Sequence, residues 1–143
     1  MPNVDVSAYV IAIQEQLSQH LQNLNELRAL QDQRALQFAE RLAVERSMQV
    51  MVEALIGVSK HYLRRKNKPI PSESGKPVVE ALSLMNMPQA QVTAMKHAVG
   101  MRNAIVHDYI NLDWDKVSDV LSEKQYDDIA NSVRTLTQGL AGE

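Results

Sequence analysis

Apolar residues recur along the first part of the chain with the spacing of a helix. Between residues 5 and 29 they step by three or four positions, which puts them on one helical stripe: Val10, Ile13, Leu17, Leu21, Leu24 and Leu27. Side chains suited to N-capping precede or open this stripe: Asn3, Asp5 and Ser7. The pattern therefore predicts a first helix at about 5–29 and a weak break at 30–34, where Asp32 is a candidate N-cap.

The rest of the chain continues in the same helical pattern, with one clear interruption. A second long helix is predicted at about 33–66, with apolar positions that include Leu42, Met48, Val52, Leu55, Ile56 and Leu63. Residues 67–77 hold three of the five prolines and are predicted to form a surface loop. Shorter helices are predicted at 76–85, at 88–108 with Pro88 in the first turn, and at 114–121 with Asp113 as cap. Ser122–Gln125 has the form of a capping box and is predicted to open the last helix.

These elements predict an all-α fold. No segment alternates apolar and polar residues as a strand does, and five glycines with five prolines are too few for a β fold rich in turns. We expect a bundle of five or six helices, with two long antiparallel helices and shorter ones packed on them. A length of 143 residues is typical of one domain, so residues 1–143 are predicted to form a single unit.

Composition limits the class of protein. The formal net charge is −2, so a nucleic-acid site has to be a local patch and not a global positive field. The absence of cysteine excludes a disulfide framework, a zinc finger and a cysteine nucleophile. No apolar run approaches the length of a membrane span, and the chain does not begin with a basic region followed by an apolar one. We therefore expect a cytoplasmic protein without a membrane association.

The candidate chemistry lies near the end of the predicted helix at 88–108. Arg102, Asn103, His107 and Tyr109 fall within eight residues. In a regular helix Arg102 and Tyr109 are about 20° apart around the axis, whereas Arg102 and His107 are about 140° apart. Arginine and histidine can then meet if the arginine reaches around, if the helix unwinds near His107, or if a second subunit contributes. Gly100, two residues before Arg102, suits the close approach of another backbone or a ligand.

These groups suit cleavage of RNA without a metal ion. The His107 imidazole can take the proton of a 2′-hydroxyl or give one to the leaving 5′-oxygen near neutral pH. The Arg102 guanidinium keeps its charge and can bind phosphate oxygens in the transition state. The alternative interpretation is an ordinary polar helix end, because an Arg-x4-His spacing arises readily by chance.

The segment from Arg102 to Tyr109 resembles the Arg-x4-His-x-Tyr motif of the HEPN superfamily, in particular its HepT toxin branch. The resemblance extends from Glu45–Val50 through His61 on the second helix, and includes Val99–Met101 before the motif and Leu112–Asp115 after it. It covers roughly residues 40–138, and the first helix is similar only in pattern. The resemblance implies a HEPN-type helical bundle and a metal-independent endoribonuclease.

The resemblance also implies partners and roles for single residues. Arg102 and His107 would be the catalytic pair in a homodimer, with Asn103 as the polar residue that follows the arginine. The protein would be the toxin of a type VII-like HEPN/MNT toxin–antitoxin system and would act on cellular RNA such as mRNA or tRNA. An MntA-like nucleotidyltransferase antitoxin would silence it by transferring AMP from ATP to Tyr109. No bound cofactor or metal is implied, and AMP would be present only as this covalent modification.

Two further interpretations stay open. A basic cluster at the end of the second predicted helix suits either contact with an RNA backbone or favourable charge at a helix C-terminus: Lys60, Arg64, Arg65, Lys66 and Lys68. The alternative function is a non-catalytic HEPN helper subunit that binds nucleotide or positions the substrate of a nucleotidyltransferase. The intact motif favours the ribonuclease, because a helper does not need all three of its side chains.

Overall fold

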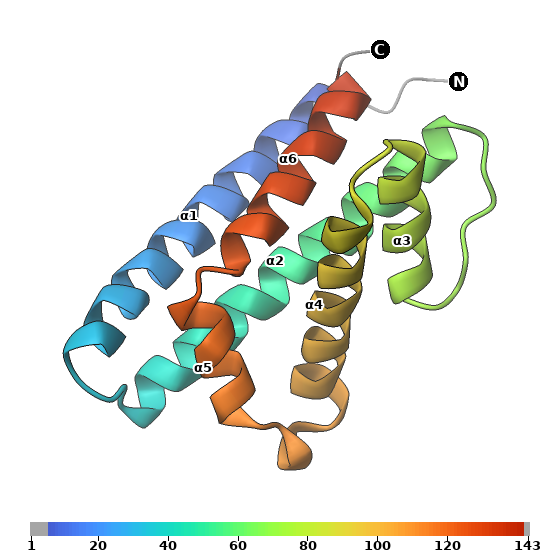
Figure 1. Cartoon of the computed structure of the whole chain (residues 1–143). Coiled ribbons are helices and arrows are strands. Elements are labelled where there is room, and N and C mark those ends of the chain that lie inside the picture. The colour runs from blue at the N-terminus through green and yellow to red at the C-terminus, as the bar shows by residue number, and fades with distance from the viewer. Residues whose placement is uncertain (1–5, 142–143) are drawn as a thin grey trace.

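The computed structural model describes residues 6–141, and the regular structure of these residues is entirely helical (Figure 1). The elements in chain order are α1 (Val6–Gln33), α2 (Phe38–Arg65), α3 (Gly75–Leu84), α4 (Gln89–His107), the single-turn 3₁₀ helix η1 (Tyr109–Asn111), α5 (Trp114–Ser122) and α6 (Tyr126–Ala141). The predicted all-α class is therefore confirmed. So are the long antiparallel pair, α1 and α2, and the loop before α3.

α2 is the central helix. α1 and α6 lie side by side against it, and α3 and α4 pack on it from another side (Figure 1). Because neighbours surround it, α2 is apolar around most of its circumference, as expected for a buried helix. Its fully buried side chains include Val44, Met48, Met51, Leu55 and Leu63. This burial holds the backbone of α2 in place, so polar side chains on its remaining face are presented from a rigid support.

The connection between α1 and α2 differs from the prediction. α1 continues to Gln33, so Asp32 lies inside the helix and does not cap α2. α2 begins after Gln37, whose backbone N–H donates to the Glu40 carboxylate at 2.7 Å. The start of the helix is thus set by a cap beyond the predicted break. The predicted caps Asn3 and Asp5 lie outside the described residues.

Three of the described helices are followed, two positions after their last residue, by a residue with a left-handed backbone. Asn67 (φ 58°), Asn86 (φ 58°) and Lys124 (φ 54°) follow α2, α3 and α5. In each case the next N–H bonds back to a carbonyl of the last helical turn, and asparagine tolerates this conformation better than most residues. Lys124 also explains why the predicted capping box at Ser122 is wrong. Ser122 is the last residue of α5, and the reversal at Lys124 delays the start of α6 to Tyr126.

The segment after α4 is short and leads directly into α5. Asp108 leaves the helical conformation with φ −143° and ψ 46°, and η1 follows at once. The Asp113 carboxylate then accepts the backbone N–H of Asp115 at 3.0 Å, which confirms the predicted cap of α5. Within η1, the Tyr109 side chain reaches back to Glu45 in the first half of α2.

Candidate active site

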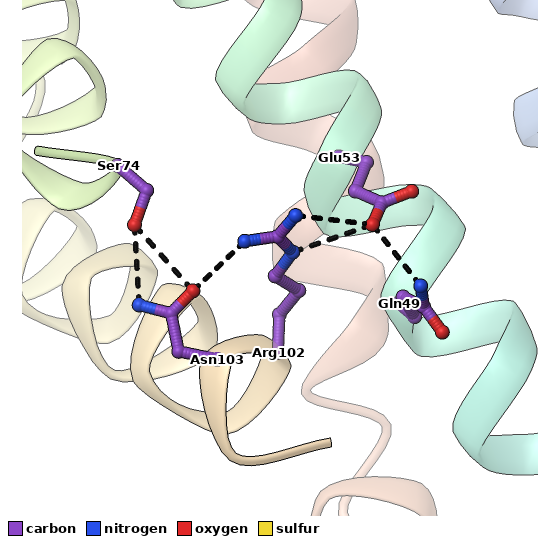
Figure 2. A network of polar contacts seen from close by, with 5 residues as sticks. All are labelled: Gln49, Glu53, Ser74, Arg102 and Asn103. Atoms are coloured by element: carbon purple, nitrogen blue, oxygen red, sulfur yellow. Dashed lines mark hydrogen bonds and ion pairs between the residues drawn. The ribbon is translucent and has the colours of Figure 1, made fainter. Parts of the chain in front are cut away.

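Arg102 is held by one group on α2 and by its own neighbour on α4. Its Nε and Nη2 donate to Glu53 Oε2 on α2 at 3.3 and 3.2 Å, and its Nη1 donates to Asn103 Oδ1 at 2.9 Å (Figure 2). Asn103 Nδ2 in turn donates at 3.1 Å to Ser74 Oγ, at the end of the loop before α3. Gln49 Nε2 donates to the same Glu53 oxygen at 3.1 Å. The guanidinium therefore has a defined orientation although the side chain keeps 19% of its surface exposed.

Sequence reasoning found Arg102 and Asn103 but missed Glu53, Ser74 and Gln49. The available signal was the i, i+4 pair Gln49 and Glu53, which interrupts the otherwise apolar stretch 48–56. A polar pair at such positions needs a partner, because a buried or half-buried polar group without one is costly. Which residue would be the partner depends on how α4 crosses α2, and this is a property of the packed molecule.

His107 is the last residue of α4 and is exposed. Its imidazole makes no hydrogen bond or ion pair with any residue between 6 and 141. α4 remains helical through His107, so of the three ways in which Arg102 and His107 could meet, unwinding before His107 does not occur. The two side chains stay about 140° apart around the axis and about 7.5 Å apart along it.

Tyr109 lies where helix phase does not apply. The backbone leaves α4 at Asp108, so helix phase within α4 does not determine the direction of the Tyr109 side chain. The Tyr109 hydroxyl instead donates to Glu45 Oε1 on α2 at 2.7 Å. Glu45 is buried, at 6% exposure, whereas the Tyr109 side chain is accessible, with 47% of its surface exposed. This bond to Glu45 raises the pKa of the Tyr109 hydroxyl, and desolvation and the glutamate charge add to the effect.

Arg102 and Tyr109 consequently contact different parts of α2. Their partners Glu53 and Glu45 are eight residues apart, which corresponds to about 12 Å along a helix. One chain therefore presents a sequence of groups along α4 and η1: the anchored guanidinium, then the unpartnered imidazole, then the tyrosine hydroxyl. A single chain does not gather them at one point.

The basic cluster occupies the far end of α2. Arg64 and Arg65 are exposed in the last turn of the helix, and Lys68 is exposed just beyond it. Lys66 lies over the Tyr62 ring, with Nζ 5.5 Å from the centroid. Arg64 is eleven residues beyond Glu53, or about 16 Å along the helix, so the cluster is nearer to Arg102 than to Tyr109. As an RNA contact the cluster stays a prediction.

Large apolar side chains are exposed at the Tyr109 end of the molecule. The only phenylalanine, Phe38, is 72% exposed, and Ile110 is 97% exposed. We call this set the apolar patch: Phe38, Leu42, Val106, Tyr109 and Ile110. Phe38 and Leu42 share a face of α2 with Glu45, within about 60° around the axis, so they lie on the side that Tyr109 contacts. Large apolar side chains that stay exposed to this extent are typical of an interface.

Residues 6–141 contain neither a metal-binding cluster nor a membrane-spanning helix. No three His, Cys, Asp or Glu side chains in this range lie close enough to hold a metal ion together. None of the helices in the same range has the length and apolar character that crossing a bilayer would require.

Two solved toxin–antitoxin structures each contain a chain with the same fold. A chain from a crystal structure of a toxin–antitoxin with AMP-PNP superposes with a TM-score of 0.77 and 22% identity, over 94% of this chain and 99% of that chain. A tri-AMPylated Shewanella oneidensis HEPN toxin, in complex with an MNT antitoxin, superposes with a TM-score of 0.75 and 22% identity, over 99% of this chain and 100% of that chain. At this identity the likeness shows the fold alone.

Sequence comparison is more specific about the family. A search of curated protein sequences finds no match. The profile of the family described as Ribonuclease HepT-like matches residues 15–136, which is most of the chain and includes α2, α4 and the whole Arg102–Tyr109 motif. The chain therefore belongs to the HepT-like ribonuclease family of HEPN proteins.

Proposed function

We propose that this protein is the ribonuclease toxin of a toxin–antitoxin pair, and that it cleaves RNA through Arg102 and His107 without a metal ion. The observation that carries the proposal is the contrast between these two side chains on one helix. Arg102 is oriented by Glu53 and Asn103, whereas His107, five residues later, has an exposed imidazole that bonds to no residue from 6 to 141. An oriented cation and a free imidazole are the groups that phosphodiester cleavage by an internal 2′-hydroxyl needs.

The chemistry assigns one role to each group. The 2′-oxygen attacks the adjacent phosphorus, the bond to the 5′-oxygen breaks, and a 2′,3′-cyclic phosphate remains. An imidazole takes the 2′-hydroxyl proton, or protonates the leaving 5′-oxygen, because its pKa is close to neutral pH. A guanidinium donates two parallel hydrogen bonds to the phosphate oxygens, where negative charge builds up in the transition state.

The functional unit in this proposal is a homodimer. The angle of about 140° between Arg102 and His107 means that the arginine of one chain is better placed to meet the histidine of another. The apolar patch supports this assembly, because a two-fold axis near Ile110 would bury the patches of two chains against each other. Gly100 supports it too. It is exposed on α4, and a Cβ there would meet no atom within 4 Å of its own chain. Packing inside the chain therefore does not explain a glycine at this position.

The proposed regulator is a nucleotidyltransferase antitoxin that transfers AMP to Tyr109. The tri-AMPylated HEPN toxin with its MNT antitoxin has the same fold, which supports an AMP acceptor in this chain as well. Tyr109 suits the role because its ring is accessible and it follows His107 by two residues. AMP on Tyr109 would bring phosphate charge and bulk to the His107 end of α4, where it would exclude the RNA backbone.

The ribonuclease proposal is tested with the purified, unmodified protein and cellular RNA in excess EDTA. We expect cleavage to continue and the products to carry 2′,3′-cyclic phosphate ends. His107→Ala should lower the cleavage rate by about 100-fold or more, since it removes the acid–base group. His97→Ala is the matched control, because His97 is also an exposed histidine of α4 and should be dispensable. Equal cleavage by His107→Ala, or loss in EDTA with rescue by Mg²⁺, would contradict the proposal.

A further inference from the structure

We propose that Glu45 is the catalytic residue that takes the proton from Tyr109 when the tyrosine oxygen attacks the α-phosphate of ATP. This inference rests on the proposed function, in which Tyr109 is the acceptor of AMP. It assigns to the toxin itself, and not to the transferase, the base that activates the acceptor hydroxyl. The observation behind it is the hydrogen bond from the Tyr109 hydroxyl to Glu45 Oε1 at 2.7 Å.

The bond joins an accessible nucleophile to a buried base. The Tyr109 side chain is 47% exposed, so an incoming phosphate can reach its oxygen, whereas Glu45 is only 6% exposed. An ionised carboxylate only accepts hydrogen bonds, so the proton in this pair lies on the tyrosine oxygen and points at Glu45. A length of 2.7 Å is typical of a strong bond from a hydroxyl to a charged acceptor. The proton is thus already directed to the group that would receive it.

The tyrosine needs such a group. A phenol has an ordinary pKa near 10, and the contact with Glu45 raises the pKa of Tyr109 above that value. Free tyrosinate is therefore scarce at neutral pH, and the proton has to leave while the new bond to phosphorus forms. Glu45 disfavours a tyrosinate formed in advance, but it is well placed to accept the proton during the reaction.

The transfer balances with ATP as the only co-reactant. The Tyr109 oxygen forms a bond to the α-phosphorus, and the bond from that phosphorus to the bridging oxygen of the β-phosphate breaks. The electron pair of the broken bond leaves with pyrophosphate. The phenolic proton passes to the Glu45 carboxylate and from there to solvent. ATP is bound and oriented by the partner nucleotidyltransferase.

Neighbouring groups do not offer the same contact within the chain. Arg102, which could stabilise a tyrosinate, is anchored at Glu53, about 12 Å further along α2 than Glu45. His107 is two residues from Tyr109, but its imidazole makes no hydrogen bond with Tyr109 or with any other residue from 6 to 141. Glu45 stands about two turns into α2, where the buried backbone fixes its position before the partner arrives.

The test measures the rate of AMP transfer by the partner enzyme, with intact mass as readout and the toxin concentration varied at saturating ATP. Glu45→Gln keeps the shape of the side chain and an accepting oxygen but cannot take a proton. We expect kcat to fall by about 100-fold or more, with little change in KM for the toxin. Glu45→Asp retains a carboxylate one methylene further back and should be intermediate. Glu80→Gln, an exposed glutamate of α3, is the matched control and should behave as wild type.

A second measurement separates proton transfer from a structural role. Fluorinated tyrosine incorporated at position 109 has a more acidic phenol and depends less on a base. It should restore a large part of the rate that Glu45→Gln loses. If Glu45 had only a structural role, a more acidic phenol at position 109 would not restore the rate. Circular dichroism and the thermal midpoint verify that each variant is folded.

The outcomes distinguish this inference from the function on which it rests. If wild type accepts AMP and Tyr109→Phe does not, the acceptor is confirmed. An unchanged kcat in Glu45→Gln would then overturn the role of Glu45 alone. A change confined to KM, or no recovery with fluorotyrosine, would also overturn the role of Glu45. The same holds if His107→Ala loses AMP transfer while Glu45→Gln keeps it in full. If wild type accepts no AMP at Tyr109, the proposed regulation itself is wrong.

Discussion

The Arg102 side chain is oriented by a chain of contacts and not by a single ion pair. Glu53 binds it from α2, and Asn103 binds it from the next position of α4. Asn103 is itself fixed by Ser74, so the loop before α3 also bears on the guanidinium (Figure 2). Charge alone would be satisfied by Glu53. The amide bond to Nη1 sets the direction in which the remaining N–H groups point.

This arrangement predicts graded effects on RNA cleavage. Asn103→Ala removes the acceptor of Arg102 Nη1 and should lower kcat, by up to about 100-fold, because a small displacement of a catalytic group is costly. Ser74→Ala leaves the bond between Arg102 and Asn103 in place and should have a clearly smaller effect. Single-turnover cleavage of one RNA by both variants makes the comparison. Equal losses in the two variants would contradict a role for Asn103 in orienting the arginine.

At the scale of elements, the turn between α1 and α2 is closed by one carboxylate. Arg34 donates from both Nη atoms to the two oxygens of Glu40, each at 2.8 Å, and the Gln37 N–H donates to the same group. The hydrogen bonds from Arg34 are the largest of the effects that lower the pKa of Glu40 from 4.5 to about 2. Glu40 therefore joins the end of one long helix to the start of the next.

The lowered pKa predicts how Glu40→Gln depends on pH. A group whose pKa is lower in the folded state stabilises the fold above its unfolded pKa. That contribution is lost as the pH falls through its folded pKa. The variant should be less stable than wild type at pH 7, and the difference should shrink between pH 4.5 and about 2. Urea unfolding at a series of pH values measures this. A difference that does not change with pH would mean that the charge of Glu40 is not involved.

At the scale of the whole molecule, the candidate groups are spread along one side of α2. The basic cluster lies at its C-terminal end, Arg102 at its middle, and Tyr109 with the apolar patch near its N-terminal end. One chain therefore offers a long surface with separated groups. Two such surfaces, related by a two-fold axis at the apolar patch, would bring the His107 ends of two α4 helices towards each other.

The dimer proposal predicts that two inactive variants complement each other. Arg102→Ala and His107→Ala, unfolded together and refolded as a mixture, should form heterodimers that contain one site with both groups intact. With random pairing and one arginine and one histidine from different chains per site, about a quarter of wild-type activity should return. If both groups act within one chain, the mixture should stay inactive. Ile110→Glu in both chains is the control, because it should disrupt the apolar patch and abolish the recovery.

The sequence by itself determined the features that depend on neighbouring residues. Helical periodicity located the long helices and their class, since a stripe of apolar residues is a local pattern. Asp113 was recognisable as a cap because its partner N–H is two residues away. The short motif of Arg102, His107 and Tyr109 was visible for the same reason, and its surroundings indicated the family to which the chain belongs.

Only the tertiary structure decided what those residues contact. The end of α1 at Gln33 and the start of α6 at Tyr126 depend on the cap at Gln37 and on the left-handed residue Lys124. The local sequence offers equally plausible signals at Asp32 and Ser122. Helix phase could not place Tyr109, because α4 ends two residues earlier. Glu53 as partner of Arg102, and Glu45 as partner of Tyr109, are 49 and 64 positions away in sequence. Such pairs arise from the way α4 and η1 cross α2, and this crossing is set by the packing of the whole core and not by any local pattern of residues.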